Sequence, residues 1–182
     1  KRLFPEVEDA VRFNKTFSAV SVRYGDDKLF DEKGFAWADP NFFQVLDFKI
    51  LYGDINTALS RPRTLVITES TAKKYFGTED AIGKTLLVGS KDAYEVTAVM
   101  ADVPSNSHFS FDLLTSMYSQ QGIDDETIHW NNPNYTTFLL TKPEGGFVSP
   151  EADAIESLPA PSASRVEIPV RRAVCRDPPL SV

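Results

Sequence analysis

The sequence is poor in several features that would point to particular classes of protein. It contains a single cysteine, Cys175, which excludes an internal disulfide and a multi-cysteine zinc cluster. It has no apolar run of the roughly 18–20 residues that a membrane-spanning helix needs, and no signal-peptide core at its start. Basic residues number 19 against 26 acidic ones, a formal net charge of −7, and they form no cluster. Nucleic-acid binding is therefore not expected.

Apolar and aromatic residues, in contrast, are plentiful. Hydrophobic residues make up 42% of the chain and thirteen are Phe, which is the composition of a folded globular protein. The 182 residues can form one core, or a core with a small lobe. Because the sequence begins at Lys1 without a methionine, we expect it to be a segment of a longer protein. Seven of the twelve prolines lie in residues 143–182, and we predict an unassigned Pro-rich tail over residues 161–182.

The most regular pattern lies in the middle of the chain. The apolar run Leu65–Ile67 predicts a strand, and Thr68 predicts the N-cap of a helix that follows it. Glu69 and Lys73 are spaced four residues apart with the acid first, the order that stabilises a helix. Gly77 is then suited to the left-handed conformation that ends helices. These positions together predict a short helix packed on a sheet.

A hairpin is predicted immediately after this helix. Residues 84–88 and 94–100 flank a polar turn, and Tyr94, Val96, Ala98 and Met100 are expected on one face of the second strand. Further elements are expected on both sides: a helix over 5–11, a hairpin of strands 17–24 and 28–30, a helix over 40–46 capped by Asp39, a strand over 48–51, a helical turn over 57–59, and strands over 109–114 and 135–140.

Four segments carry a resemblance to a known family. They are Ile67–Gly77 (Ile-Thr-Glu-Ser-Thr-Ala-Lys-Lys-Tyr-Phe-Gly), Ile82–Leu86 (Ile-Gly-Lys-Thr-Leu), Tyr94–Val99 (Tyr-Glu-Val-Thr-Ala-Val) and Asp102–Phe109 (Asp-Val-Pro-Ser-Asn-Ser-His-Phe). In this order they resemble the MacB-like periplasmic core domain of FtsX-type ABC transporter permeases, in its Bacteroidetes-type branch. Ala81 and Ala98 depart from the pattern, since the family often has Pro and Gly there.

The resemblance implies both a fold and a role. The fold would be α+β, a mixed sheet with short helices packed on it, with a porter-like part and a smaller β-rich lobe, over residues 1–160. The domain would lie in the periplasm as part of an inner-membrane protein, and it would be non-catalytic, with no cofactor. A separate nucleotide-binding domain or subunit would hydrolyse ATP. A permease homodimer or heterodimer would couple this to export or to mechanical action on a periplasmic or outer-membrane partner.

Recognition of such a partner is expected in loops, because loops on a rigid scaffold are where recognition usually lies. The polar stretch of residues 122–134 is one candidate. The predicted partner-contact loop consists of Pro104, Ser105, Asn106, Ser107 and His108.

Several groups of residues have the right types for chemistry but lack a supporting pattern. Ser107, His108 and Asp112 contain the residue types of a hydrolase triad without a Gly-x-Ser-x-Gly turn, so a hydrogen-bonded turn is the preferred interpretation. Gly83-Lys84-Thr85 resembles the end of a phosphate-binding loop, but its first glycine is missing and a strand is expected next. Nucleotide binding is therefore rejected.

Metal sites are also weakly supported. Asp125, Glu126 and His129 have helical spacing but no further His or Cys ligand, so a solvated face is preferred. The acidic residues of the first hairpin lack the order of a calcium loop and are expected to be ordinary surface charges; they are Asp26, Asp27, Asp31 and Glu32. Trp37 and Trp130 are expected to be buried anchors rather than a ligand patch.

Two other functions stay open at this point. The first is a free-standing periplasmic or secreted binding module, which the absence of an attached membrane span in the parent protein would favour. The second is a small hydrolase that uses Ser107 and His108, which only turnover lost on their substitution would support.

Overall fold

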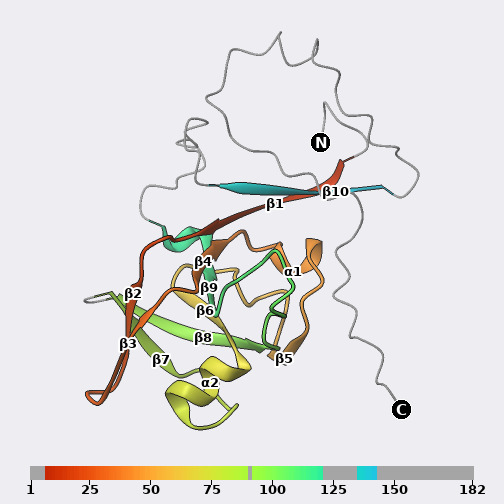
Figure 1. The fold of residues 1–182 in the computed structure, drawn as a ribbon. Coiled ribbons are helices and arrows are strands. Elements are labelled where there is room, and N and C mark those ends of the chain that lie inside the picture. The colour runs from red at the N-terminus through yellow and green to blue at the C-terminus, as the bar shows by residue number, and fades with distance from the viewer. Residues whose placement is uncertain (1–6, 90–91, 121–134, 143–182) are drawn as a thin grey trace.

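The structure is a computed structural model that describes residues 7–89, 92–120 and 135–142. Within these ranges the chain forms ten strands and three short helices (Figure 1). In chain order they are β1 (Val7–Lys15), β2 (Val20–Tyr24), β3 (Lys28–Glu32), β4 (Phe35–Ala38), α1 (Phe42–Val45), β5 (Ile50–Gly53), β6 (Thr64–Thr68), α2 (Glu69–Phe76), β7 (Thr85–Val88), β8 (Asp92–Met100), β9 (Leu113–Ser116), the 3-10 helix η1 (Met117–Ser119) and β10 (Thr136–Thr141).

All ten strands belong to one mixed sheet. Its order is β10-β1-β4-β9-β6-β8-β7-β2-β3, and β5 pairs with the far end of β8. The β4–β9 and β6–β8 pairs are parallel, and the remaining pairs are antiparallel. The expected α+β fold, a mixed sheet with short helices packed on it, is confirmed. The β1–β10 pair forms the end of the sheet opposite β3 (Figure 1).

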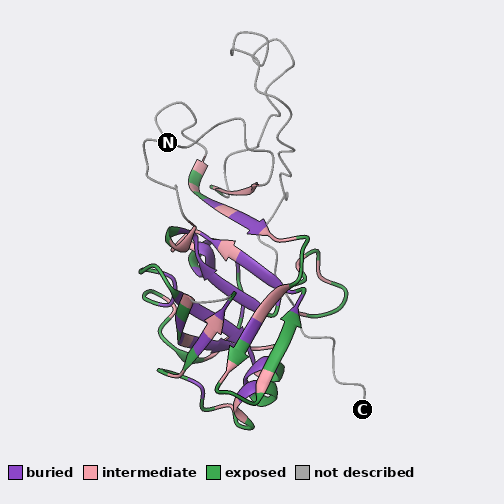
Figure 2. Cartoon of the chain, turned by 90° about the vertical axis from the view of Figure 1, so that its left-hand side faces the viewer, coloured by how far each residue is buried: buried purple, intermediate pink, exposed green. Residues whose placement is uncertain are grey.

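The sheet is covered on both faces. In β6, Val66 belongs to one apolar cluster, whereas Leu65 and Ile67 belong to the other. Because successive side chains of a strand point to opposite faces, the two clusters lie on opposite sides of the sheet. The buried residues are concentrated in the strands at the middle of the molecule (Figure 2).

The cluster on the α1 side is rich in phenylalanine. Phe42 stacks on Phe48 with ring centroids 5.4 Å apart, and Phe109 packs edge-on against Phe48 at 5.3 Å and against Phe13 at 5.4 Å. Phe111 completes the group at 5.5 Å from Phe48. The other cluster contains Ala72 and Tyr75 of α2. Phe109 and Phe111 were expected inside a strand, but they precede β9 and fill the core from a loop.

Helix α2 forms as the sequence predicts. The Thr68 hydroxyl accepts a hydrogen bond from the backbone N–H of Thr71 at 3.4 Å, and Lys73 pairs with Glu69 one turn earlier. Gly77 ends the helix with φ 70°, and its N–H donates to the Lys73 carbonyl at 2.9 Å. Local capping therefore accounts for both ends of this helix.

Both predicted hairpins are confirmed, as β2–β3 and β7–β8, and the final strand is confirmed as β10. The expected shared face of β8 is wrong, however. Tyr94 and Val96 join the α2-side cluster, whereas Ala98 and Met100 join the α1-side cluster. The register with β6 shifts at this point, so that Thr97 is an extra residue, a β-bulge that reverses the alternation.

Three other local predictions are wrong. The helix expected over 5–11 is strand β1 over the residues that the structure describes, because Val11 and Phe13 alternate into the core. The strand expected over 48–51 lies two residues later, as β5, and residues 57–59 form turns rather than a helix. In those turns the Asp54 carboxylate accepts from the backbone N–H of Asn56 at 3.0 Å.

The helix expected over 40–46 is reduced to α1, and Asp39 does not cap it. The Asp39 carboxylate instead accepts from the backbone N–H of Arg12 at 2.8 Å and from its guanidinium at 2.8 and 2.9 Å. This pairing ties β1 to the segment before α1. None of the helices in the described part of the chain is long and apolar enough to cross a membrane.

Candidate functional site

The predicted partner-contact loop follows β8 and is anchored at its C-terminal end. The backbone N–H of Ser107 donates to the Pro104 carbonyl at 2.9 Å, and the Ser107 hydroxyl accepts from the backbone N–H of Phe109 at 3.1 Å. The Phe109 ring then packs in the aromatic core. Ser107 is half-buried, and the other four loop residues, Pro104 to Asn106 and His108, are exposed. The loop is thus a hydrogen-bonded turn on a rigid base.

This turn does not assemble a catalytic triad. The Ser107 hydroxyl is engaged by the backbone, and no hydrogen bond links it to His108 or Asp112 in the described structure. Asp112 is held elsewhere, since its backbone N–H donates to the Gly34 carbonyl at 2.8 Å. Burial raises the pKa of the Asp112 carboxyl, and the nearby carboxylate of Glu32 raises it further. The preferred interpretation of the sequence, a structural turn, agrees with this geometry.

Glu32 is not an ordinary surface charge, and that expectation was wrong for this residue. Its carboxylate is buried at the end of β3 and accepts from the Tyr75 hydroxyl at 2.5 Å and from the Lys74 ammonium at 2.8 Å. Burial, together with this hydrogen bond, raises the pKa of Tyr75. The Lys74 ammonium also lies 4.4 Å from the centroid of the Phe30 ring. The contacts fasten the β2–β3 hairpin to α2.

The other candidate sites are not formed or lie outside the described residues. Gly83 donates its backbone N–H to the Val96 carbonyl and leads into β7, so it ends no phosphate-binding loop. Trp37 is half-buried and packs edge-on against Phe35 at 5.0 Å. The described ranges contain no group of three His, Cys, Asp or Glu side chains that could hold a metal ion. The stretch 122–134, with Asp125, Glu126, His129 and Trp130, and the tail 161–182 lie outside those ranges.

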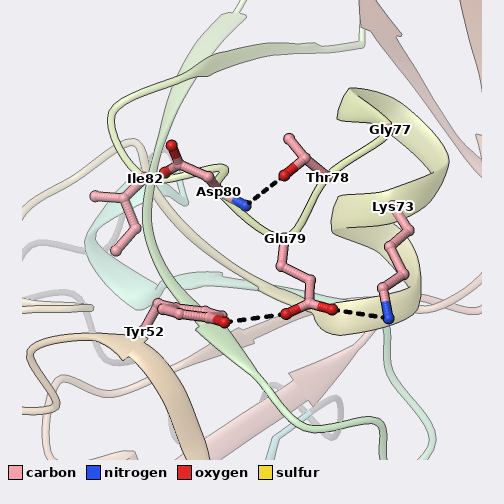
Figure 3. Close-up of a pocket in the computed structure, with 7 residues that line it drawn as sticks. All are labelled: Tyr52, Lys73, Gly77, Thr78, Glu79, Asp80 and Ile82. Carbon is pink, nitrogen blue, oxygen red and sulfur yellow. Dashed lines mark hydrogen bonds and ion pairs between the residues drawn. The ribbon is translucent and has the colours of Figure 1, made fainter.

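A surface depression that sequence reasoning missed lies beside the C-terminal half of α2 (Figure 3). Its volume is about 670 Å³. Two large apolar side chains are exposed in its lining, with 45% of Tyr52 and 44% of Ile82 accessible to solvent. The remaining lining residues are Lys73, Gly77, Thr78, Glu79 and Asp80.

Hydrogen bonds connect the polar groups of this depression in a row. The Tyr52 hydroxyl donates to one carboxylate oxygen of Glu79 at 3.0 Å, and the Lys73 ammonium contacts the other at 3.0 Å (Figure 3). Lys73 also pairs with Glu69. The hydrogen bond to Glu79 raises the pKa of Tyr52, while the Lys73 ammonium lowers the pKa of Glu79. The Asp80 carboxylate has no hydrogen-bond or ion-pair partner among the described residues.

The sequence does not predict this depression, because its lining residues come together only in the folded chain. Tyr52 comes from β5, 17 residues before the first residue of α2 and 27 before Glu79. The one signal in the sequence was Ile82, an apolar residue at the end of the polar run Thr78-Glu79-Asp80. Nothing in the sequence shows that β5 crosses beside that turn.

Comparison with known proteins identifies the family. The model of the MacB-like periplasmic core domain matches residues 1–157. The chain belongs to this family. Domains of this family are periplasmic or extracellular parts of ABC transporter permeases. No curated protein matches the chain.

Solved structures of similar domains agree with this MacB-like assignment. A domain of a putative permease protein from Porphyromonas gingivalis superposes with a TM-score of 0.65 at 25% identity, covering 84% of this chain and 69% of that one. The periplasmic region of MacB from Actinobacillus actinomycetemcomitans gives 0.56 at 17% identity, over 85% and 65% of the two chains. The extracellular domain of the noncanonic ABC-type transporter YknZ from Gram-positive bacteria gives 0.51 at 18%, over 84% and 71%. The last two comparisons show a shared fold.

Proposed function

We propose that this domain is the non-catalytic extracytoplasmic part of an ABC transporter permease of the inner membrane. In the proposal, a separate nucleotide-binding domain or subunit hydrolyses ATP, and a permease homodimer or heterodimer passes the resulting motion to this domain. The domain then drives substrate export or acts mechanically on a periplasmic or outer-membrane partner. The observation that carries the proposal is the family match over residues 1–157.

The construction of the sheet supports a mechanical role. Ten strands form one sheet whose two faces are both packed, and close-packed interiors transmit displacement rather than absorb it. The Glu32 contacts to Tyr75 and Lys74 fasten the edge hairpin to α2, and the Arg12 contacts to Asp39 fasten β1. A force applied at one end of such a sheet would move the whole domain.

Domain boundaries and partner contact belong to the same proposal. We place the domain at residues 1–160 and treat 161–182 as a tail, an assignment supported by the end of the family match at residue 157. We also propose that the turn from Pro104 to His108 contacts the partner, because it presents exposed side chains on an anchored base.

The role is tested with the full-length protein. We expect it to fractionate with the inner membrane, and an affinity-tagged copy extracted in detergent should retain an ATP-binding subunit that mass spectrometry identifies. Substitution of that subunit's catalytic glutamate should abolish all ATP hydrolysis by the complex. Recovery of the full-length protein from the periplasmic fraction, without a membrane span, would instead establish a free-standing binding module.

The loop is tested separately, by the capture of crosslinked periplasmic partners. Replacing Pro104, Ser105 and Asn106 with alanine should reduce capture, while replacing Asp26 and Asp27 in the exposed β2–β3 turn should not. Equal capture by both variants, with unchanged melting temperatures, would remove the loop from the proposal.

A further inference from the structure

The depression beside α2 has an unequal balance of charge. The lining carries two carboxylates, those of Glu79 and Asp80, and one ammonium group, that of Lys73, so one negative charge remains in excess. Lys73 is already shared between Glu69 and Glu79. Asp80 carries an unpaired carboxylate. The lining therefore favours a cationic ligand over an anionic one.

The same lining also exposes apolar surface. Tyr52 and Ile82 are two of the few large hydrophobic side chains that the described residues leave exposed, and both line this depression. The hydroxyl of Tyr52 is held by Glu79, which fixes the ring close to a carboxylate. Figure 3 shows Tyr52 and Ile82 on the side of the depression opposite Lys73. Glu79 lies between these two residues and Lys73. A ligand that fits must therefore combine a positive charge with apolar contact.

We propose that this depression binds an arginine side chain, with a neighbouring apolar residue, from an extended segment of a partner protein. A guanidinium is planar and weakly hydrated, and it can stack on an aromatic ring while it donates two hydrogen bonds to a carboxylate. Tyr52 supplies the ring, Asp80 supplies the free carboxylate, and Ile82 supplies the apolar contact. The surface is distinct from the loop at residues 104–108, and the proposal does not depend on the transport role.

The test uses the 182-residue chain and a defined probe. The probe is the peptide acetyl-Ser-Leu-Arg-Leu-Ser-amide, titrated to about 5 mM so that dissociation constants near 1 mM can be measured by amide chemical shifts. Citrulline in place of arginine gives a neutral peptide of the same shape. We expect the arginine peptide to shift the amides of Tyr52 and of residues 77–82, and to bind at least threefold more tightly than the citrulline peptide.

Variants separate a specific site from general attraction to an acidic protein. Asp80→Asn should weaken binding about threefold, the range expected for an exposed ion pair, and Tyr52→Ala should weaken it further. Asp31→Asn is the matched control, because Asp31 is also an exposed carboxylate without a partner in the described structure, but it lies on β3. Equal effects of the two Asn substitutions, equal binding of the two peptides, or shifts confined to other regions would each overturn the proposal.

Discussion

Two glycines in the left-handed region of backbone space should respond very differently to the same substitution. Gly77 has φ 70° at the end of α2, and a Cβ atom added there would meet no atom within 4 Å. Gly53 has φ 100° in β5, and its added Cβ would lie 2.5 Å from the Thr97 carbonyl oxygen and 2.8 Å from the Cα and Cβ of Ala98. The first site is therefore limited by backbone conformation alone, and the second also by contact with β8.

These geometries set the magnitudes. A residue with a Cβ pays roughly 1–2 kcal/mol in the left-handed region, and this is the whole expected loss of unfolding free energy for Gly77→Ala. Gly77→Val, with a β-branched side chain, should lose at least as much. At Gly53 the obstructing atoms include backbone, which cannot rotate away, so overpacking adds about 1–3 kcal/mol. Gly53→Ala should therefore lose about 2–5 kcal/mol.

The assay is urea unfolding followed by circular dichroism, with the midpoint and slope fitted separately. Gly25→Ala is the control, because Gly25 has φ 63° and open space around its added Cβ. We expect the Gly25 and Gly77 variants to lose similar stability and the Gly53 variant to lose distinctly more, all with unchanged slope. Equal losses at Gly53 and Gly77 would refute the close approach of β5 to β8, and with it the position of Tyr52 in the depression.

Two further predictions concern polar groups that interact with the Glu32 carboxylate. Tyr75→Phe removes the hydroxyl that donates to Glu32, and it should lower the unfolding free energy by about 1.5–3 kcal/mol, the usual range for a hydrogen bond to a charged group. The control is Tyr118→Phe, at an exposed tyrosine. A loss at Tyr75 no larger than the loss at Tyr118 would contradict this prediction. Burial and the Glu32 carboxylate raise the pKa of Asp112, so the folded chain holds this proton more tightly than the unfolded chain and stability falls as the pH rises above about 4. Asp112→Asn should therefore raise the melting temperature more at pH 7 than at about pH 3.5, and an equal shift at both pH values would count against it.

Helix α2 could be predicted from sequence because its determinants are local. The cap at Thr68, the Glu69–Lys73 pair and the left-handed Gly77 all act within one or two turns of the chain. The β2–β3 and β7–β8 hairpins have the same character, since short turns set their registers. The resemblance to a family rested on α2, on parts of β7 and β8 and on the loop Asp102–Phe109, and the family match confirmed it.

Elements that depend on distant partners were predicted wrongly. The spacing of Val7 and Val11 suits a helix as well as a strand, and β1 is a strand because it pairs with β4 and with β10, more than a hundred residues away. Asp39 has the residue type of a helix cap, but a bidentate contact to Arg12 outcompetes the weaker cap. The depression was missed for the same reason, since Tyr52 approaches Glu79 only in the folded sheet.

The bulge at Thr97 explains why one strand can serve both faces of the sheet. Before it, Tyr94 and Val96 pack on the α2 side; after it, Ala98 and Met100 pack on the α1 side. The Thr97 hydroxyl donates to the Ala58 carbonyl at 2.7 Å and contacts the Leu65 carbonyl at 3.3 Å, so the extra residue is held from both sides. Beyond the bulge, β8 pairs with β5 through the close approach at Gly53. The bulge therefore sets where β5 lies, and β5 in turn carries Tyr52 to the depression beside α2.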